Sequence, residues 1–158
     1  MKVFCPGLLS GKYIATKYAH KGVQGGQNIS PQISWGDVPN GTKSFVLSII
    51  DRHPIARNWV HWYVINIPSS TREIAEKASG MREKMPAGSL ELRNTFGDIG
   101  YGGPKPPKSS GAHDYVITVY AVNVESLPLG PFSTIEECTK ELEGKVLASA
   151  NTVGIFQQ

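Results

Sequence analysis

The sequence predicts a mainly β protein, a β-sandwich with one or two short peripheral helices. Four segments alternate in hydrophobicity and are rich in β-branched or aromatic residues, as expected of strands. The 17 glycines and 11 prolines are spread along the chain, which is typical of short strands joined by turns. The chain has 158 residues and shows no internal repeat or linker, so we expect one domain over residues 1–158.

The four predicted strands cover residues 44–51, 61–67, 115–123 and 146–156. Residues 61–67 are mostly apolar on both faces, and alternation places His61 and Trp62 on opposite sides. A strand that is apolar on both faces belongs in the middle of a sheet, so we expect this one to be central.

Helical signals are confined to two short segments. Residues 133–136 (STIE) fit a capping box with Ser133 as its first residue, and Cys138 and Leu142 then follow at helical spacing. This pattern predicts a helix of about ten residues. A weaker apolar stripe predicts a second helix over residues 71–78.

Charge and targeting signals exclude several classes of protein. The net charge is +3 and the basic residues are scattered, which argues against a nucleic-acid partner. Residues 1–6 lack the pattern of a signal peptide, and no stretch reaches 18 apolar residues, so we expect a cytoplasmic protein without a membrane span. A disulfide between Cys5 and Cys138 is not expected in that reducing compartment.

Motifs for catalysis and cofactor binding are absent from the sequence. There is no G-x-S-x-G elbow, P-loop, G-x-G-x-x-G, H-E-x-x-H or paired C-x-x-C. We therefore expect a binding protein without a cofactor rather than an enzyme, and any site must be built from single residues.

The residues best suited to form a site lie near strand ends. Asp51 ends the first strand, His61 opens the second and His113 precedes the third. If these strands are neighbours, the three side chains can converge, and a carboxylate can orient an imidazole by accepting one ring N–H. Two oriented imidazoles would then offer donors to an anion. A zinc site that also uses His53 is the less favoured alternative, because zinc needs three or four ligands in tetrahedral reach.

The segment between the second and third strands has an unusual composition. Residues 94–113 contain five glycines and three prolines and few apolar side chains. Prolines stiffen such a loop, and glycines let backbone N–H groups approach a ligand closely. The composition therefore favours the wall of a small pocket.

Three segments, taken together, carry a family resemblance. They are residues 27–35 (QNISPQISW), 59–62 (WVHW) and 100–115 (GYGGPKPPKSSGAHDY). Each is weak alone, but in this order and spacing they resemble the phosphatidylethanolamine-binding, Raf-kinase-inhibitor-like family. The tail at residues 146–156 is similar to the prokaryotic branch of that family.

The resemblance implies an antiparallel β-sandwich with a small cavity at one end that accepts phosphate, acetate or phosphoethanolamine-like groups. The pocket residues that it assigns are Asp51, Trp59, His61, Gly103, Pro104, His113 and Tyr115. One departure concerns the ligand. The family's D-P-D-x-P element is Asp51-Arg52-His53-Pro54 here, so the second acidic residue is missing and His53 is a candidate to take its place at the cavity rim.

From these expectations we predict a non-catalytic binding and regulatory protein with a small anionic or phospho-headgroup ligand. The resemblance also implies a kinase or a protease as a protein partner. Two alternatives remain: an inhibitor whose loop at residues 52–57 occupies a protease site, and a hydrolase that uses Asp51 with His61 or His113 as a general base. An apolar sheet edge would also allow a homodimer.

Overall fold

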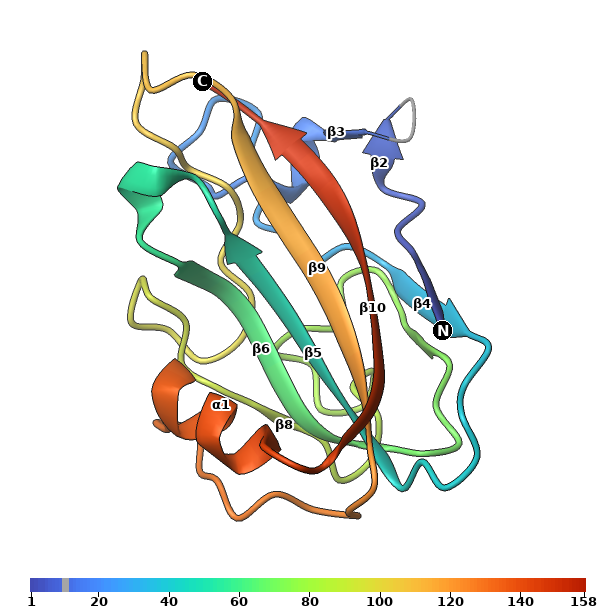
Figure 1. Ribbon diagram of the computed structural model, residues 1–158. Coiled ribbons are helices and arrows are strands. Elements are labelled where there is room, and N and C mark those ends of the chain that lie inside the picture. The colour runs from blue at the N-terminus through green and yellow to red at the C-terminus, as the bar shows by residue number, and fades with distance from the viewer. Residues whose placement is uncertain (10–11) are drawn as a thin grey trace.

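Two packed β-sheets form the main body of the computed structural model, which describes residues 1–9 and 12–158 (Figure 1). In the described residues the larger sheet has the strand order β2-β3-β10-β9-β5-β6-β8, and the smaller has the order β1-β4-β7. The strands are β1 (Lys2–Phe4), β2 (Leu8–Leu9), β3 (Tyr13–Ile14), β4 (Ile33–Gly36), β5 (Ser44–Asp51), β6 (Trp59–Pro68), β7 (Glu73–Ile74), β8 (Leu90–Glu91), β9 (His113–Val122) and β10 (Val146–Phe156). The helical elements are α1 (Ile135–Leu142) and two 3-10 turns, η1 (Thr16–Tyr18) and η2 (Pro54–Ala56). The predicted mainly β fold is confirmed, although β10 pairs with β3 in parallel.

The four long strands are the four segments predicted from alternation. β5 and β10 have the predicted bounds, and β6 and β9 each begin two residues earlier than predicted. β5 pairs with β9 and β6 in antiparallel register, with Asp51 opposite both Tyr115 and Trp59. β6 is less central than predicted, because its outer neighbour β8 pairs with it at only two positions, Val64 and Ile65.

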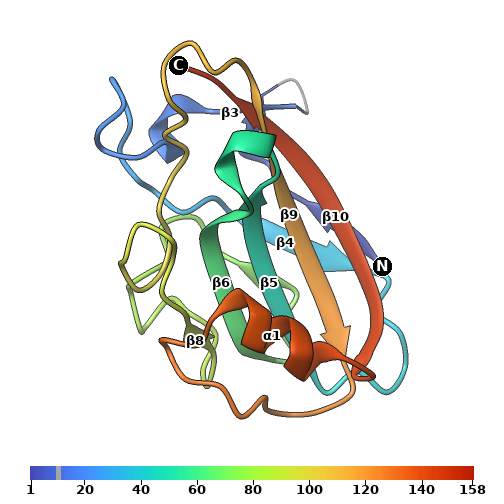
Figure 2. The same ribbon diagram turned by 60° about the vertical axis from the view of Figure 1, so that its left-hand side comes forward.

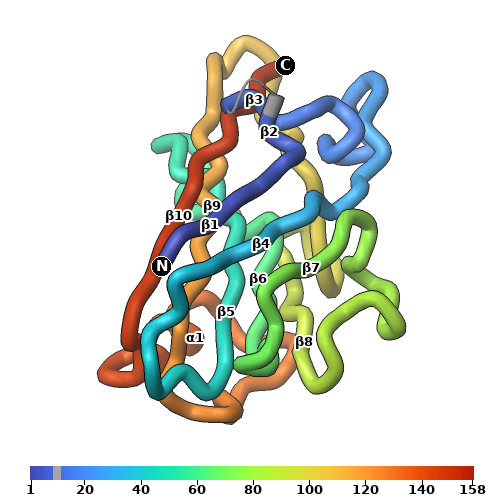
Figure 3. The backbone as a smooth tube through the Cα atoms, turned by 90° about the vertical axis from the view of Figure 1, so that its right-hand side faces the viewer, coloured from blue at the N-terminus to red at the C-terminus, as the bar shows by residue number. Residues whose placement is uncertain are grey.

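The larger sheet buries apolar side chains on both of its faces. Its inner face packs against the smaller sheet, as Figure 3 shows from the side of β1, β4 and β7. Trp35 of β4 meets Phe45 of β5 there, edge to face, with ring centroids 5.3 Å apart. The outer face carries α1, as Figure 2 shows. Cys138 and Leu142 of this helix pack with Tyr63 of β6.

α1 is one residue out of register with the predicted capping box. The N-cap is Thr134, whose hydroxyl accepts the Glu137 N–H at 3.2 Å, while the Glu137 carboxylate accepts the Thr134 N–H at 2.7 Å. The box is therefore Thr134 to Glu137 rather than Ser133 to Glu136, since both spacings fit the same pattern. Within residues 1–9 and 12–158, no helix has the length and apolarity that a bilayer span requires.

The predicted helix at residues 71–78 is wrong. Residues 73 and 74 form β7, which pairs with β4 and buries Ile74 opposite Ile33. Lys77 then adopts a left-handed backbone with φ of 61°, which an α-helix cannot contain. The apolar residues of this segment serve the smaller sheet and the turn after it, so their helical spacing was coincidental.

A β-bulge in β6 changes which way two neighbouring side chains point. Ile49 opposes Trp62 and Ile50 opposes Val60, so His61 is an extra residue without a partner in β5. Trp62 packs in the inner core with Tyr115, and the His61 ring lies 5.0 Å from the ring of Tyr115. His61 and Trp62 thus share the inner face, and the prediction of opposite faces fails because of the bulge.

The two cysteines, both within the described residues, are free thiols. Cys138 is buried under α1 and Cys5 is half-buried beside the inner core. Burial raises the pKa of each thiol to about 11, so both keep their protons at neutral pH.

Candidate functional site

A cavity of about 330 Å³ lies at the end of the larger sheet where β5 ends and β6 and β9 begin. Because both neighbours run antiparallel to β5, their first residues meet its last residue at this edge. The lining residues are Asp51, Ile55, Ala56, Trp59, His61, Phe96, Lys105, Pro106, Pro107, His113 and Tyr115. The volume falls within the usual range for small-molecule sites.

Five of the seven predicted pocket residues line this cavity: Asp51, Trp59, His61, His113 and Tyr115. Gly103 and Pro104 are not among the lining residues. The Gly103 N–H donates to Asn28 at 2.7 Å, and the Pro104 carbonyl accepts the His20 N–H at 3.0 Å. These two residues therefore hold the Gly/Pro loop against the N-terminal segment, and a Cβ at Gly103 would collide with the Tyr18 carbonyl.

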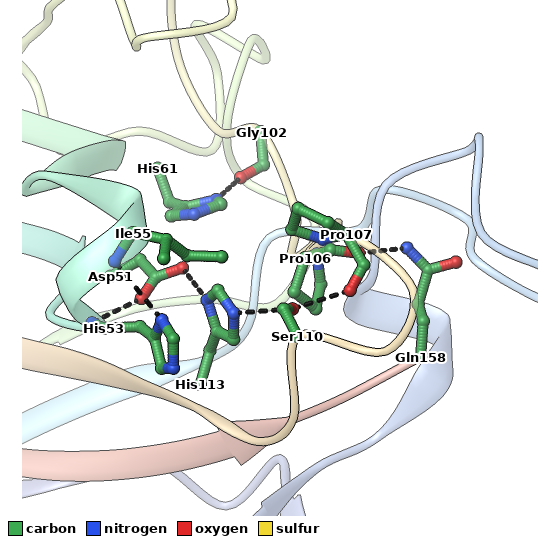
Figure 4. A network of polar contacts seen from close by, with 10 residues as sticks. All are labelled: Asp51, His53, Ile55, His61, Gly102, Pro106, Pro107, Ser110, His113 and Gln158. Atoms are coloured by element: carbon green, nitrogen blue, oxygen red, sulfur yellow. Dashed lines mark hydrogen bonds and ion pairs between the residues drawn. The ribbon is translucent and has the colours of Figure 1, made fainter.

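Asp51 and His113 form a buried pair at the base of the cavity (Figure 4). Asp51 Oδ2 accepts the His113 Nδ1–H at 2.6 Å, and Asp51 Oδ1 accepts the backbone N–H of His53 at 2.9 Å. The side chains are 5% and 1% exposed, respectively. Both carboxylate oxygens are thus already bonded within the chain.

The second nitrogen of His113 is also engaged. His113 Nε2 lies 2.9 Å from Ser110 Oγ, which in turn lies 2.6 Å from the Pro107 carbonyl oxygen. Two oxygens at 2.6 Å need a proton between them, so the single hydroxyl proton of Ser110 goes to Pro107. Both ring nitrogens of His113 are therefore engaged within the chain, Nδ1 by Asp51 and Nε2 by Ser110.

His53 does not take the place of the missing acid at the cavity rim. Its ring stacks on that of His113, with centroids 3.9 Å apart and planes 13° apart, and it is not among the lining residues. Its Nδ1 accepts the N–H of Ile55 at 3.4 Å and caps η2. His53 therefore supports the His113 ring, while the Arg52 guanidinium donates to Asn58 at 2.6 Å.

His61 is held by a two-sided contact with Gly102. The ring Nδ1 lies 2.6 Å from the Gly102 carbonyl oxygen, and the Gly102 N–H donates to the His61 carbonyl at 2.8 Å. A carbonyl can only accept, so Nδ1 carries the proton. Burial lowers the pKa of His61 to about 4, which the Gly102 carbonyl and nearby Asp51 offset only in part. His61 is therefore neutral at physiological pH, with a free lone pair on Nε2.

Two polar groups of lining residues are buried without a hydrogen-bond partner, the Tyr115 hydroxyl and the Trp59 indole N–H. Burial raises the pKa of Tyr115, so its hydroxyl keeps its proton and can donate. Buried donors without partners are rare in native proteins. The third such group among the described residues, Trp35 Nε1, lies in the inner core instead.

The Gly/Pro loop walls the cavity, as its composition predicted, but through residues that the sequence did not identify. Phe96, Lys105, Pro106 and Pro107 line the space. Lys105 is exposed and forms no ion pair with any residue of the described ranges. The η2 turn adds Ile55 and Ala56, which short-range sequence patterns could not place because they depend on how the loop after β5 folds back.

The zinc alternative has no support from the geometry. Across residues 1–9 and 12–158, no three His, Cys, Asp or Glu side chains are grouped so that they could hold a metal ion. The Asp51 oxygens and both His113 nitrogens already have protein partners.

The fold and this cavity define a β-sandwich protein with a ligand-sized space at one end of its larger sheet. The family model described as phosphatidylethanolamine-binding protein matches residues 7–157. The chain belongs to this family.

Relatives cover the whole chain. A UPF0098 protein of Aquifex aeolicus is 39% identical over 158 residues, covering 100% of this chain and 89% of the relative. UPF0098 protein YbhB of Escherichia coli is 34% identical, covering 99% of both. The crystal structure of E. coli YbcL, described as a new member of the mammalian PEBP family, has a TM-score of 0.90 at 31% identity and covers 99% of this chain and 98% of YbcL. The carboxypeptidase Y inhibitor, solved with its cognate proteinase, shares only the fold, at 14% identity, a TM-score of 0.58 and a coverage of 99% of this chain and 83% of the inhibitor.

Proposed function

We propose that the chain is a non-catalytic binding protein whose cavity takes a small acidic group, phosphorylated or carboxylated. One observation carries the proposal: unpaired donors from Trp59 and Tyr115 belong to residues that line the same cavity as the ammonium-bearing Lys105.

The charge balance of the cavity favours an anion. Asp51 is bonded to His113 as a buried pair, and His61 is neutral because burial lowers its pKa to about 4. Lys105 is the lysine among the lining residues, and its ammonium lies beside Gly22. A single positive charge beside low-dielectric walls attracts an anion more strongly than it would in open water.

The remaining lining suits the uncharged part of a small ligand. Ile55, Phe96, Pro106 and Pro107 present apolar surface, and the Phe96 ring stands edge-on to Trp59 at 5.2 Å and to His61 at 5.6 Å. An acidic group on a short organic stem would place its oxygens at the donors and its stem against these side chains.

The same geometry disfavours the hydrolase alternative. A general base needs a free nitrogen or oxygen within reach of the water that it activates. Both nitrogens of His113 and both oxygens of Asp51 are bonded within the chain. His61 has a free Nε2, but its other nitrogen is held by a carbonyl rather than by a carboxylate, so it lacks the partner that would stabilise a developing imidazolium.

Part of the loop at residues 52–57 belongs to the rim of this cavity. Its residues 54–56 form η2, and Ile55 and Ala56 line the space. Ile55 is nevertheless 56% exposed. We propose that a kinase or protease partner, which the family implies, would contact this rim, so that ligand and partner influence one another.

Titration calorimetry at pH 6 with inorganic phosphate, phosphoethanolamine and acetate tests the proposal. We expect at least one of them to bind, and we expect Lys105→Ala to weaken that binding about fivefold. Lys108→Ala is the matched control, because Lys108 lies on the same loop, is exposed and does not line the cavity. Vesicles that contain phosphatidylethanolamine separate recognition of the lipid from recognition of the free headgroup. Absence of binding by the wild type to all of these probes would end the proposal.

A further inference from the structure

Building on the proposed function, we infer that His61 acts as a hydrogen-bond acceptor and makes the cavity selective for acids that still carry a proton, in particular the monoanions of phosphate monoesters. Fully ionised groups such as sulfates and phosphate dianions would be discriminated against.

Nε2 of His61 is the ring nitrogen that remains for a ligand. The two contacts with Gly102, at 2.6 Å to the ring and 2.8 Å to the backbone, fix the ring orientation and place the proton on Nδ1. His61 is 2% exposed and lines the cavity. Within the described residues the ring hydrogen bond of His61 is the one between Nδ1 and the Gly102 carbonyl, drawn in Figure 4, and none is formed by Nε2. Its lone pair is therefore available to a guest.

Charged and titratable groups of β5, β9 and the Gly/Pro loop surround His61. Asp51 at the end of β5 and His113 at the start of β9 oppose one another, since Asp51 raises and His113 lowers the pKa of His61. Tyr115 of β9 keeps its proton because burial raises its pKa, and Lys105 of the Gly/Pro loop adds a further positive charge to the lining. None of these groups forms a hydrogen bond with the His61 ring, so none is placed to hold a second proton on it.

The lining residues combine hydrogen-bond donor groups with one acceptor, His61 Nε2. Lys105, Tyr115 and Trp59 are lining residues that carry donor groups, and those of Tyr115 and Trp59 are buried without a partner, whereas His61 Nε2 can only accept while the ring is neutral. A hydrogen phosphate monoester has both ionised oxygens for the donors and one O–H for Nε2. A fully ionised group would place an oxygen lone pair against the lone pair of Nε2. Leaving a buried acceptor unpaired in this way weakens binding by roughly ten- to a hundredfold.

Methyl phosphate and methyl sulfate form a matched pair of probes. At pH 5.0 both are monoanions of nearly the same shape, and they differ in one acidic proton. We expect calorimetry to show that methyl phosphate binds at least about tenfold more tightly. Above pH 7 its affinity should fall about tenfold per pH unit, because the second pKa of a phosphate monoester is about 6.

Each outcome of this experiment has a defined meaning. Equal affinities would overturn the inference and leave the proposed anion site intact, whereas failure of both probes, and of the ligands tested above, to bind would overturn both. Uptake of one proton on binding methyl sulfate, measured in buffers of different ionisation enthalpy, would show that His61 becomes a donor and would also overturn the inference.

Two further measurements do not depend on that comparison. In His61→Gln the side-chain amide can donate, so the preference for methyl phosphate should shrink or reverse. In the wild type saturated with methyl phosphate, the ¹⁵N resonance of His61 Nε2 should keep the shift of an unprotonated imidazole nitrogen. A resonance that moves to the protonated range would contradict the acceptor role even if His61→Gln fails to fold.

Discussion

Replacing Asp51 by asparagine would test whether the buried pair with His113 stabilises the end of the sheet. Asparagine keeps the volume of the side chain but has one acceptor oxygen in place of two. In the wild type, Asp51 accepts from His113 at 2.6 Å and from the His53 backbone at 2.9 Å, so one of these donors would face an amide N–H₂ group in the variant. The His113 ring, 1% exposed, would also lose the carboxylate bonded to its Nδ1.

Removing one partner of a buried carboxylate–imidazole pair costs about 3 kcal/mol, because the other group stays buried without its partner. We therefore expect Asp51→Asn to lower the free energy of unfolding by about 3 kcal/mol, which is a midpoint shift of roughly 1 to 2 M urea for a domain of this size. Urea unfolding followed by tryptophan fluorescence at pH 7 measures it. Asp114→Asn is the control, since Asp114 is the exposed neighbour of His113 on β9. A loss within about 0.5 kcal/mol of the control would refute a stabilising role of this pair.

Three other perturbations probe the supports of the site. Gly103→Ala should destabilise the protein by about 2 kcal/mol or more in urea unfolding, because the new Cβ meets the Tyr18 carbonyl; Gly130→Ala, where a Cβ meets nothing within 4 Å, should be nearly neutral, and equal effects would contradict the tight approach. Burial lowers the pKa of His61 from the ordinary value near 6.5 to about 4, so between these pH values the unfolded state binds more protons than the folded state. The free energy of unfolding should therefore fall by about 3 kcal/mol as the pH drops through this range. If His61→Gln shows the same pH profile of urea midpoints as the wild type, His61 is not the cause. Ser110→Ala should cost about 1 kcal/mol, since it removes the hydroxyl that links His113 to the loop carbonyl, whereas Ser109→Ala, at an exposed position, should not reach half of that loss.

The long strands could be predicted from the sequence because alternation and β-branched content reflect burial directly. The bounds of β5 and β10 agree with the alternating segments. The direction of His61 could not be predicted, since a bulge leaves no mark in hydrophobic alternation and is fixed by pairing with a strand elsewhere in the chain. The apolar stripe around Ile74 led to the wrong prediction of a helix for a related reason, because a short edge strand and a helix can bury the same residues.

Apart from the Gly/Pro loop, which composition assigned to the wall as a whole, the residues predicted to form the site lie at or near strand ends. Asp51, His61 and His113 meet because β5 lies between β6 and β9 in antiparallel order. Phe96 and Lys105 belong to a loop whose path depends on distant contacts, such as that of Gly103 with Asn28 at 2.7 Å. The proton positions were also beyond the sequence. They follow from which carbonyl or hydroxyl oxygen each ring nitrogen meets, and they change the expected role of His61 from donor to acceptor.

Because of the bulge in β6, one residue of the strand can line the cavity while its neighbour packs in the core. His61 is an insertion between Val60 and Trp62, whose partners in β5 are consecutive residues, so the pairing at this point would become regular if His61 were deleted. A second irregularity in the same pairing, between Phe45 and Leu47, would remain. Trp62 can therefore stay locked in the core, with its indole N–H on Glu91 at 2.8 Å, whatever side chain occupies the inserted position. Ligand preference can diversify at this one residue without the interior of the sandwich having to be rebuilt.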